Sequence, residues 1–278
     1  MDLWHVAAAL VSAMLHAGWN AAVKASANPR EVMAAQMVTG AVIVLPGLLW
    51  TGLPAPASWP WIAASTAINM ATVTALLRAY ELIGFGAVYP VVRALSVLLV
   101  VPLAAGFSGE ALSPFGLIGI GLVAASLLLL ALGSTGTSAP PRAALVWIVL
   151  AGAGTAAYVL CDAQGVRRAA SPWAYGFAVS ITNAVAMSWM LNAMARPWRM
   201  VVDHAALAVP TAIAAMISYL LILWVWSGAP IAPAAALRDT SAVFALVIAI
   251  LWLKEPFTRL RLFAILLSAA AVPLLRFA

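Results

Sequence analysis

The sequence predicts an all-α integral membrane protein, and three observations carry that prediction. Of the 278 residues, 65% are hydrophobic and only 8% are charged, whereas a soluble domain carries roughly 25% charged residues. The mean hydropathy is +1.07. Apolar stretches of about 20 residues, the length that a helix needs to cross a bilayer, recur along the whole chain. We therefore expect a multi-pass protein of the cell inner membrane with the lipid bilayer as its surroundings.

Short breaks of Pro, Gly, Ser and charged residues divide the chain into ten such segments. Each is long enough for one transmembrane helix, and the connections are too short to hold a soluble domain. The segments are residues 3–23, 32–50, 59–80, 86–107, 113–132, 143–164, 172–194, 204–226, 232–253 and 259–277.

The chain shows signs of an internal duplication. The longest polar stretch, 133–141, predicts a linker between a first repeat, 1–132, and a second repeat, 142–278. The two parts share residues in the same order at offsets of 143 or 145: Lys24 with Arg167, Pro29 with Pro172, Arg93 with Arg238, Ser96 with Ser241, and Glu110 with Glu255. Each part holds five predicted helices, an odd number, so the second must enter the membrane in the opposite sense. The prediction is two inverted five-helix repeats, an arrangement of many secondary transporters that bind substrate at the repeat interface.

Arg93 and Arg238 are the least expected residues in this apolar chain, because a central arginine in a bilayer is costly unless it is paired or hydrated. In both repeats a Glu follows the Arg by seventeen residues, or about 26 Å of helix, close to the hydrocarbon thickness. If each Glu marks an interface, inversion places the two arginines nearer opposite membrane faces. Each is then a candidate contact for a carboxylate or phosphate; the alternative is a snorkelling or structurally paired arginine. Ser96 and Ser241 share the arginine face and could bond substrate or their own helix.

Two acidic residues also fall in apolar segments. Asp239 follows Arg238 directly, and adjacent helical residues point about 100° apart, so we expect a local counter-charge and not a facing pair. Asp162 lies near the end of the sixth segment. Intramembrane acids are candidate proton carriers, but this position favours a solvated carboxylate.

Polar residues on two segments recur at helical spacing. A polar stripe on an apolar helix must face protein or water and not lipid. Its members either line a cavity, where His16 could titrate near neutral pH, or hold the bundle together by interhelical hydrogen bonds. The stripes are His16, Trp19, Asn20 and Lys24 on the first segment, and Ser65, Asn69 and Thr72 on the third.

The aromatic residues divide into two groups. Many of the twelve Trp residues fall at segment ends, which is typical of the interfacial belt. The others are candidates for a cavity wall, where rings stack on substrates or hold cations. These candidates are Tyr80, Tyr89, Tyr158, Tyr175, Tyr219, Trp224 and Trp226.

Pro and Gly residues lie in or beside the fourth and ninth segments. Pro removes a helix hydrogen bond and kinks the helix, so these positions are candidate hinges for alternating access; the alternative for each is a static kink. The hinge candidates are Gly84, Gly86, Pro90 and Pro233.

Motifs of soluble enzymes are missing. The sequence contains no HExxH, GxSxG, Walker loop or CxxC, and its three histidines lack metal-ligand spacing. We therefore expect neither an enzyme nor a metal or cofactor. The net charge of +6 fits anionic lipid, and the absence of a basic run with interleaved aromatics argues against nucleic-acid binding.

Three stretches resemble the EamA-type transporters of the drug/metabolite transporter (DMT) superfamily: HAGWNAAVK at 16–24, RAYELIG at 78–84 and LKEPFT at 253–258. The five-plus-five duplication, with Glu after the fourth and ninth segments, resembles the same family over the whole chain. The resemblance implies ten helices around a central cavity, lined mainly by the third, fourth, eighth and ninth segments.

For function, the resemblance implies a secondary transporter that exports small metabolites, foremost amino acids and related compounds, or drug-like solutes, coupled to a proton or an exchanged solute. Relatives carry nucleotide sugars or sugar phosphates, so a carrier of phosphorylated or nucleotide-linked substrates is the alternative. From other classes, an integral membrane enzyme acting on lipid and a membrane scaffold stay open.

Two signals disagree about orientation. Nine Lys and Arg residues fall at the connections after odd-numbered segments and three on the opposite side, so the positive-inside rule puts both termini outside. The resemblance implies cytoplasmic termini. We favour the resemblance, because some of the nine can lie within helices and face a cavity.

Overall fold

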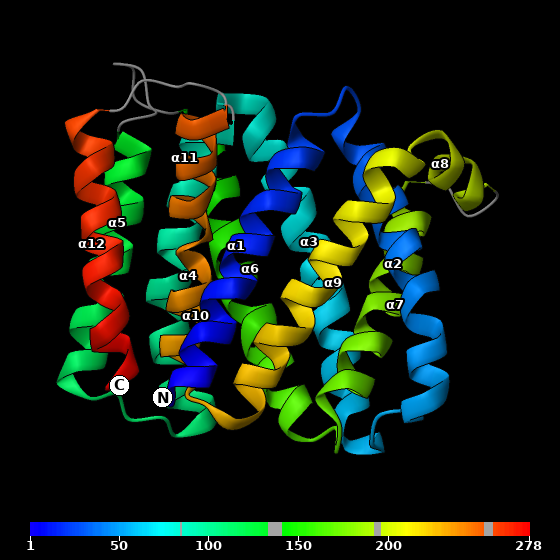
Figure 1. The fold of residues 1–278 in the computed structure, drawn as a ribbon, viewed down its shortest axis with the longest axis horizontal. Helices are drawn as coiled ribbons and strands as arrows, with labels where there is room; N and C mark the ends of the chain where they lie inside the picture. The colour runs from blue at the N-terminus through cyan, green and yellow to red at the C-terminus, as the bar shows by residue number, and fades with distance from the viewer. Residues whose placement is uncertain (84, 133–140, 192–195, 253–257) are drawn as a thin grey trace.

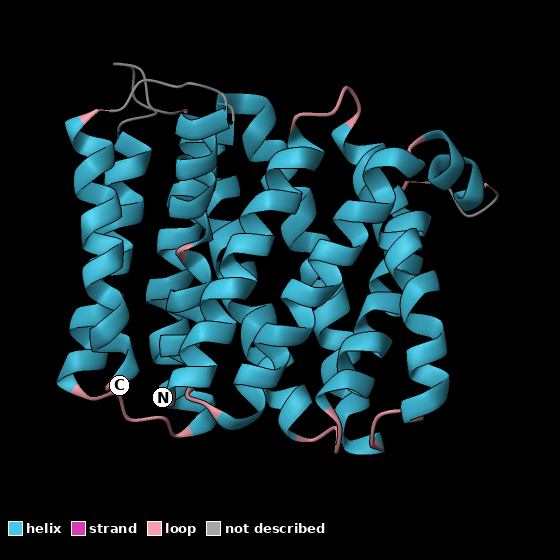
Figure 2. Ribbon diagram, viewed as in Figure 1, coloured by secondary structure: helices cyan, strands magenta, loops and turns pink. Residues whose placement is uncertain are grey.

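The computed structural model of the protein describes residues 1–83, 85–132, 141–191, 196–252 and 258–278. In these ranges the chain forms helices and no strand, and the long helices run side by side in one bundle (Figures 1 and 2). The two termini lie at the same end of the bundle (Figure 1), where the Met1 amino group donates to the Arg276 carbonyl at 2.7 Å.

The helices follow the predicted segments closely. In chain order they are α1 (Leu3–Lys24), α2 (Pro29–Thr51), the 3-10 helix η1 (Pro56–Ser58), α3 (Trp59–Ile83), α4 (Phe85–Ser108), α5 (Pro114–Leu132), α6 (Arg142–Arg167), α7 (Pro172–Met190), α8 (Pro197–Asp203), α9 (Ala205–Gly228), α10 (Ile231–Asp239), α11 (Ser241–Trp252) and α12 (Arg259–Arg276). The short α8 is not predicted by the sequence, and the ninth predicted segment is divided into α10 and α11.

The prediction of an all-α, multi-pass membrane protein is confirmed. Among the described residues, 8 helical stretches are long and apolar enough to cross a membrane: those of α1 to α6, α9, and Ile231–Ile248 through α10 and α11. Because α7 and α12 fall outside that set, the count of ten spans stays a prediction. Most of the predicted linker, residues 133–140, lies outside the described residues.

Local signals set where several helices begin. Asp2 caps α1 by accepting a hydrogen bond from the His5 backbone N–H at 2.8 Å, and Ser171 does the same for α7 through Ala174. Both residue types are preferred at this position, because the first backbone N–H groups of a helix have no partner within it.

The seams between helices join the two parts of the chain. α3 packs on α6, α1 on α9, α2 on α7 and α5 on α12. On the α1–α9 seam, Ser12 donates to the Ser218 carbonyl at 2.6 Å and Ser218 donates back to the Ser12 carbonyl at 2.7 Å. On the α3–α6 seam, a Cβ at Gly154 would overlap the Thr72 hydroxyl, so a larger residue would force the Thr72 side chain to move.

The candidate hinges fall in different surroundings. Pro90 lies inside α4, where its ring removes a backbone donor. Pro233 lies in the first turn of α10, where the backbone N–H groups have no intrahelical partner in any case. The ninth segment instead breaks at Thr240, between α10 and α11. Gly86 is the second residue of α4, and Gly84 lies outside the described residues. Their role as hinges stays a prediction.

Candidate functional site

A cavity of about 780 Å³ lies inside the bundle. Its walls come from α1 to α4 of the first part of the chain and from α6, α7, α9 and α10 of the second. The exposed residues Arg30, Glu31 and Glu81 line it at the end of the bundle that carries the α1–α2 connection, opposite the termini (Figure 1). The volume is within the range of small-molecule sites, and the cavity opens at this end.

Most of the predicted substrate-binding residues line this cavity. Residues from six helices converge there: His16, Trp19 and Asn20 from α1, Asn69 and Tyr80 from α3, Tyr89 and Arg93 from α4, Tyr158 from α6, Tyr219 from α9 and Arg238 from α10. The polar stripes on α1 and α3 therefore face a cavity, as one of their two interpretations predicts. Lys24, the last member of the α1 stripe, is excepted, because its side chain lies outside the described part of the structure.

Three of the predicted residues do not line the cavity. Ser96 and Ser241 are buried against neighbouring helices, at 1% and 0% exposure. The Ser241 hydroxyl lies 3.5 Å from the Tyr89 hydroxyl. Trp224 stacks on His5, with ring centroids 4.7 Å apart, because five residues after Tyr219 is about 140° around the helix. These three lie outside the cavity wall, and their role in substrate binding stays a prediction.

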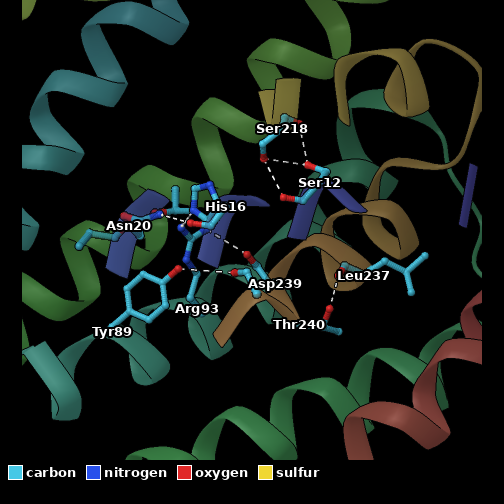
Figure 3. A network of polar contacts seen from close by, with 12 residues as sticks. Ser12, His16, Asn20, Tyr89, Arg93, Ser218, Leu237, Asp239 and Thr240 are labelled. Carbon is cyan, nitrogen blue, oxygen red and sulfur yellow. Dashed lines mark hydrogen bonds and ion pairs between the residues drawn. The ribbon is translucent and has the colours of Figure 1, made fainter. Parts of the chain in front are cut away.

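Arg93 stands at the centre of a buried polar network (Figure 3). Its Nη1 donates to Asp239 Oδ1 at 3.0 Å, its Nη2 lies 2.8 Å from His16 Nε2, and its guanidinium lies 5.0 Å from the centroid of the Tyr89 ring. The ion pair connects α4 to α10, and therefore the first part of the chain to the second. Removing one partner of such a buried pair leaves an uncompensated charge, so the pair holds these helices together.

The predicted separation of the two arginines is wrong. Arg93 bonds the residue next to Arg238, and both arginines line the same cavity. The estimate from seventeen residues of helix assumed that each Glu marks a membrane interface and that the ninth segment is one straight helix. Arg238 instead lies in the last turn of the short α10, just before the break at Thr240. Asp239 forms its ion pair with Arg93 and not with Arg238.

Arg238 has a different environment from Arg93. Its side chain is buried, at 6% exposure, and its guanidinium lies 5.7 Å from the centroid of the Trp226 ring. Its Nε atom has no hydrogen-bond partner. Among the described residues, no carboxylate lies within ion-pair distance of it.

Asp162 is a buried part of the cavity wall and not a solvated residue at a helix end. It is 2% exposed and lies within α6. Its Oδ1 accepts from the Ser65 hydroxyl at 2.6 Å and the Tyr175 hydroxyl at 3.2 Å, and its Oδ2 accepts from the Tyr219 hydroxyl at 2.8 Å. The expectation was wrong because α6 continues to Arg167, and because the donors come from three other helices.

The opposite end of the bundle is closed by polar contacts. Glu110, after α4, pairs with Arg167, at the end of α6, at 2.9 Å, and its second oxygen accepts from the Ile231 backbone N–H at 2.7 Å. Arg167 also donates to the carbonyls of Trp226 at 3.0 Å and Ala229 at 2.8 Å. We call Glu110, Arg167 and the 226–231 turn the terminal clamp. None of its residues lines the cavity, so the cavity opens at one end and is sealed at the other.

Residues 2–132 match the model of the EamA-like transporter family. This match supports an EamA-type transporter of the drug/metabolite transporter superfamily. A solved crystal structure aligns with 97% of this chain and 94% of its own at a TM-score of 0.73 and 16% identity, which supports the shared fold alone. No curated protein sequence matches the chain.

Together with the 8 long apolar helical stretches, the family match supports a multi-pass membrane transporter of a small molecule. The family match ends at Leu132, the last residue of α5.

The cavity also contains polar residues that were not predicted from the sequence. Gln36 on α2 and Asn183 on α7 line it, and their side-chain oxygens are buried without a partner, as is the Trp19 indole nitrogen. Buried polar atoms are seldom left unpaired, so these atoms are available to a bound molecule. The stripe rule could have found Asn183, which lines the cavity together with Ser180 and Met187 at helical spacing.

Proposed function

We propose that this protein is a secondary transporter that exports amino acids and related small metabolites across the inner membrane. It works by alternating access between two inverted five-helix repeats, 1–132 and 142–278, joined by the linker 133–141. A proton or an exchanged solute drives the cycle.

The cavity is the observation that carries this proposal. Both parts of the chain line it, it holds charged groups of both signs, and it is open at one end and sealed by the terminal clamp at the other. Alternating access requires a state of this kind, with a central site reachable from one side only. A scaffold has no need of such a cavity.

The pairing of helices supports the repeat. The proposal makes α1 equivalent to α6, α2 to α7, α3 to α9, α4 to α10 with α11, and α5 to α12. Contacts then come in matching sets: α3 with α6 corresponds to α1 with α9, and α4 with α6 corresponds to α1 with α10 and α11. The α2–α7 and α5–α12 contacts each join two equivalent helices, so the repeat maps each of these contacts onto itself.

A carrier of phosphorylated substrates is the second candidate, favoured by the two arginines in one cavity. The charges argue against it. Asp239 already neutralises Arg93, and Asp162 adds a carboxylate to the same cavity. A doubly charged phosphate therefore meets one available guanidinium and one repelling carboxylate.

A ligand screen followed by transport tests the proposal. Ligands that bind the native state raise its apparent stability, so amino acids should raise the unfolding temperature of the purified protein, and phosphate esters and cationic drugs should not. In liposomes, amino acids that stabilise the protein should enter faster than in empty vesicles. Stabilisation by phosphate esters alone would favour the second candidate, and no transport of any amino acid would refute the first.

A further inference from the structure

Four buried Arg and Asp side chains lie in the cavity wall or directly beside it, and they divide into two kinds. Arg93 and Asp239 satisfy each other in an ion pair at 3.0 Å. Arg238 and Asp162 line the same cavity, yet they do not form an ion pair with each other or with another described residue. Each of these two therefore lacks an opposite charge in contact.

The repeat explains why Arg238 has no partner. Arg93 of the first repeat is paired with Asp239, which follows Arg238 by one position. The mirror-image pair would need an acid one position after Arg93, and that residue is Ala94. Of the two equivalent positions, only the one in the second repeat holds an acid, Asp239, and that acid pairs with Arg93. Arg238 therefore keeps no acidic partner, and its side chain lines the cavity with an Nε atom that makes no hydrogen bond.

A buried arginine without an acidic partner lowers the stability of a membrane protein. Trp226, fully buried, holds the Arg238 guanidinium from one side by a cation–π contact at 5.7 Å. This contact orients the group without neutralising it. A carboxylate matches its planar donor fork and supplies an opposite charge in direct contact.

Asp162 presents the complementary case. Three hydroxyl groups, those of Ser65, Tyr175 and Tyr219, fix its position. A carboxylate has about four acceptor positions, so three donors leave one for a further donor. The three hydroxyls carry no positive charge, and an ammonium group supplies both the charge and the remaining hydrogen bond.

We propose that Arg238 and Asp162 form a two-point site for a zwitterion, in which Arg238 binds a carboxylate and Asp162 binds an ammonium group. The site stays neutral when such a molecule enters, because each new charge meets its opposite. Four methionines line the same cavity, Met33, Met37, Met187 and Met216, and offer an adaptable apolar surface to the substrate's side chain. The inference rests on the proposed function and narrows it to zwitterions with an apolar side chain.

Competition in liposomes tests both points. Vesicles with full-length protein are preloaded with unlabelled leucine, and uptake of labelled leucine is measured against external leucine, 3-methylbutylamine or 4-methylpentanoate. The amine lacks the carboxylate and the acid lacks the ammonium, so each should compete roughly tenfold more weakly than leucine or worse, the loss expected for a charged hydrogen bond.

The outcomes separate this inference from the proposed function. Competition by the amine as strong as by leucine overturns the Arg238 point, and equal competition by the acid overturns the Asp162 point, while transport itself stands. Exchange of other amino acids without exchange of leucine contradicts the claim that the cavity methionines bind an apolar side chain of the substrate. Absence of exchange for every amino acid refutes the proposed function, and the two-point site falls with it.

Substitutions test whether Arg238 binds the carboxylate and Asp162 binds the ammonium group. Arg238→Gln should raise the half-saturating leucine concentration roughly tenfold or more, with Arg238→Lys between it and the wild type. Arg276→Gln, which removes an exposed arginine, is the matched control and should behave as the wild type. Leucine should also raise the unfolding temperature of the wild type and not of Arg238→Gln or Asp162→Asn. Leucine stabilisation that survives in a folded variant contradicts the role of that residue.

Discussion

Arg93 and Arg238 occupy equivalent positions of the two proposed repeats, but their environments differ. Arg93 is bonded to Asp239 and His16 and ties the first part of the chain to the second, whereas Arg238 lies over Trp226 with no acid in contact. One residue makes the difference, because the position that corresponds to Asp239 holds Ala94. In the proposed repeats, equivalent arginines thus differ in role: Arg93 holds two helices together, and Arg238 is the proposed binding residue.

The largest expected effect is on stability. Arg93→Gln leaves Asp239 buried without its partner, which should lower the free energy of unfolding by about 3–5 kcal/mol. Arg238→Gln breaks no ion pair and should cost much less. Thermal unfolding of the two variants in one detergent checks this, and equal losses would erase the distinction between the arginines.

Restoring the missing acid should remove the difference. Ala94→Asp places a carboxylate where the repeat predicts a partner for Arg238, so it should compete with the substrate and reduce leucine uptake roughly tenfold. Ala94→Asn is the control, because it adds similar volume without charge at this buried position. If both variants lose the same activity, volume and not charge explains the result.

The terminal clamp should give a moderate effect. Glu110→Gln removes the charge that holds Arg167 while leaving an acceptor for the Ile231 N–H. Hydrogen bonds to charged groups contribute about 1.5–3 kcal/mol, so amide exchange of the 226–231 turn should rise roughly tenfold or more. Amides at the start of α2, near the cavity mouth, should not change. If amide exchange in the 226–231 turn stays unchanged, the terminal clamp does not seal the end of the bundle that carries the termini.

The seam between α1 and α9 should give the smallest effect. Ser12→Ala removes one donor of the reciprocal pair with Ser218, and such interhelical bonds average about 0.6 kcal/mol. Thermal unfolding should shift only slightly, far less than for Arg93→Gln. A comparable shift would mean that hydrogen bonds between the helices, and not the Arg93–Asp239 ion pair, dominate their cohesion.

Composition and helical spacing predict much of this molecule. Apolar length locates nearly every helix, because lipid allows few other solutions. The stripes at His16, Asn20 and Asn69 identify cavity walls, since polar side chains avoid lipid. These signals are local, and they depend only on residues a few positions apart on one helix.

The partners of the buried charges were not predicted, because they come from distant parts of the chain. Arg93 meets Asp239 across 146 positions, and Asp162 gathers hydroxyls from α3, α7 and α9. Arg238 likewise reaches the cavity on α10, which ends at the break before α11 and packs against α1 and α4, far away in the sequence.

The most direct test of the account is whether the cavity is the transport path. Met33→Cys places a thiol in the cavity wall and Leu49→Cys places one on the exposed lipid side of the same helix, both in a Cys161→Ser background. We expect a thiol reagent to block leucine uptake through Met33→Cys, leucine to slow that labelling, and Leu49→Cys to keep its uptake. Uptake that continues after complete labelling of Met33→Cys would contradict the account.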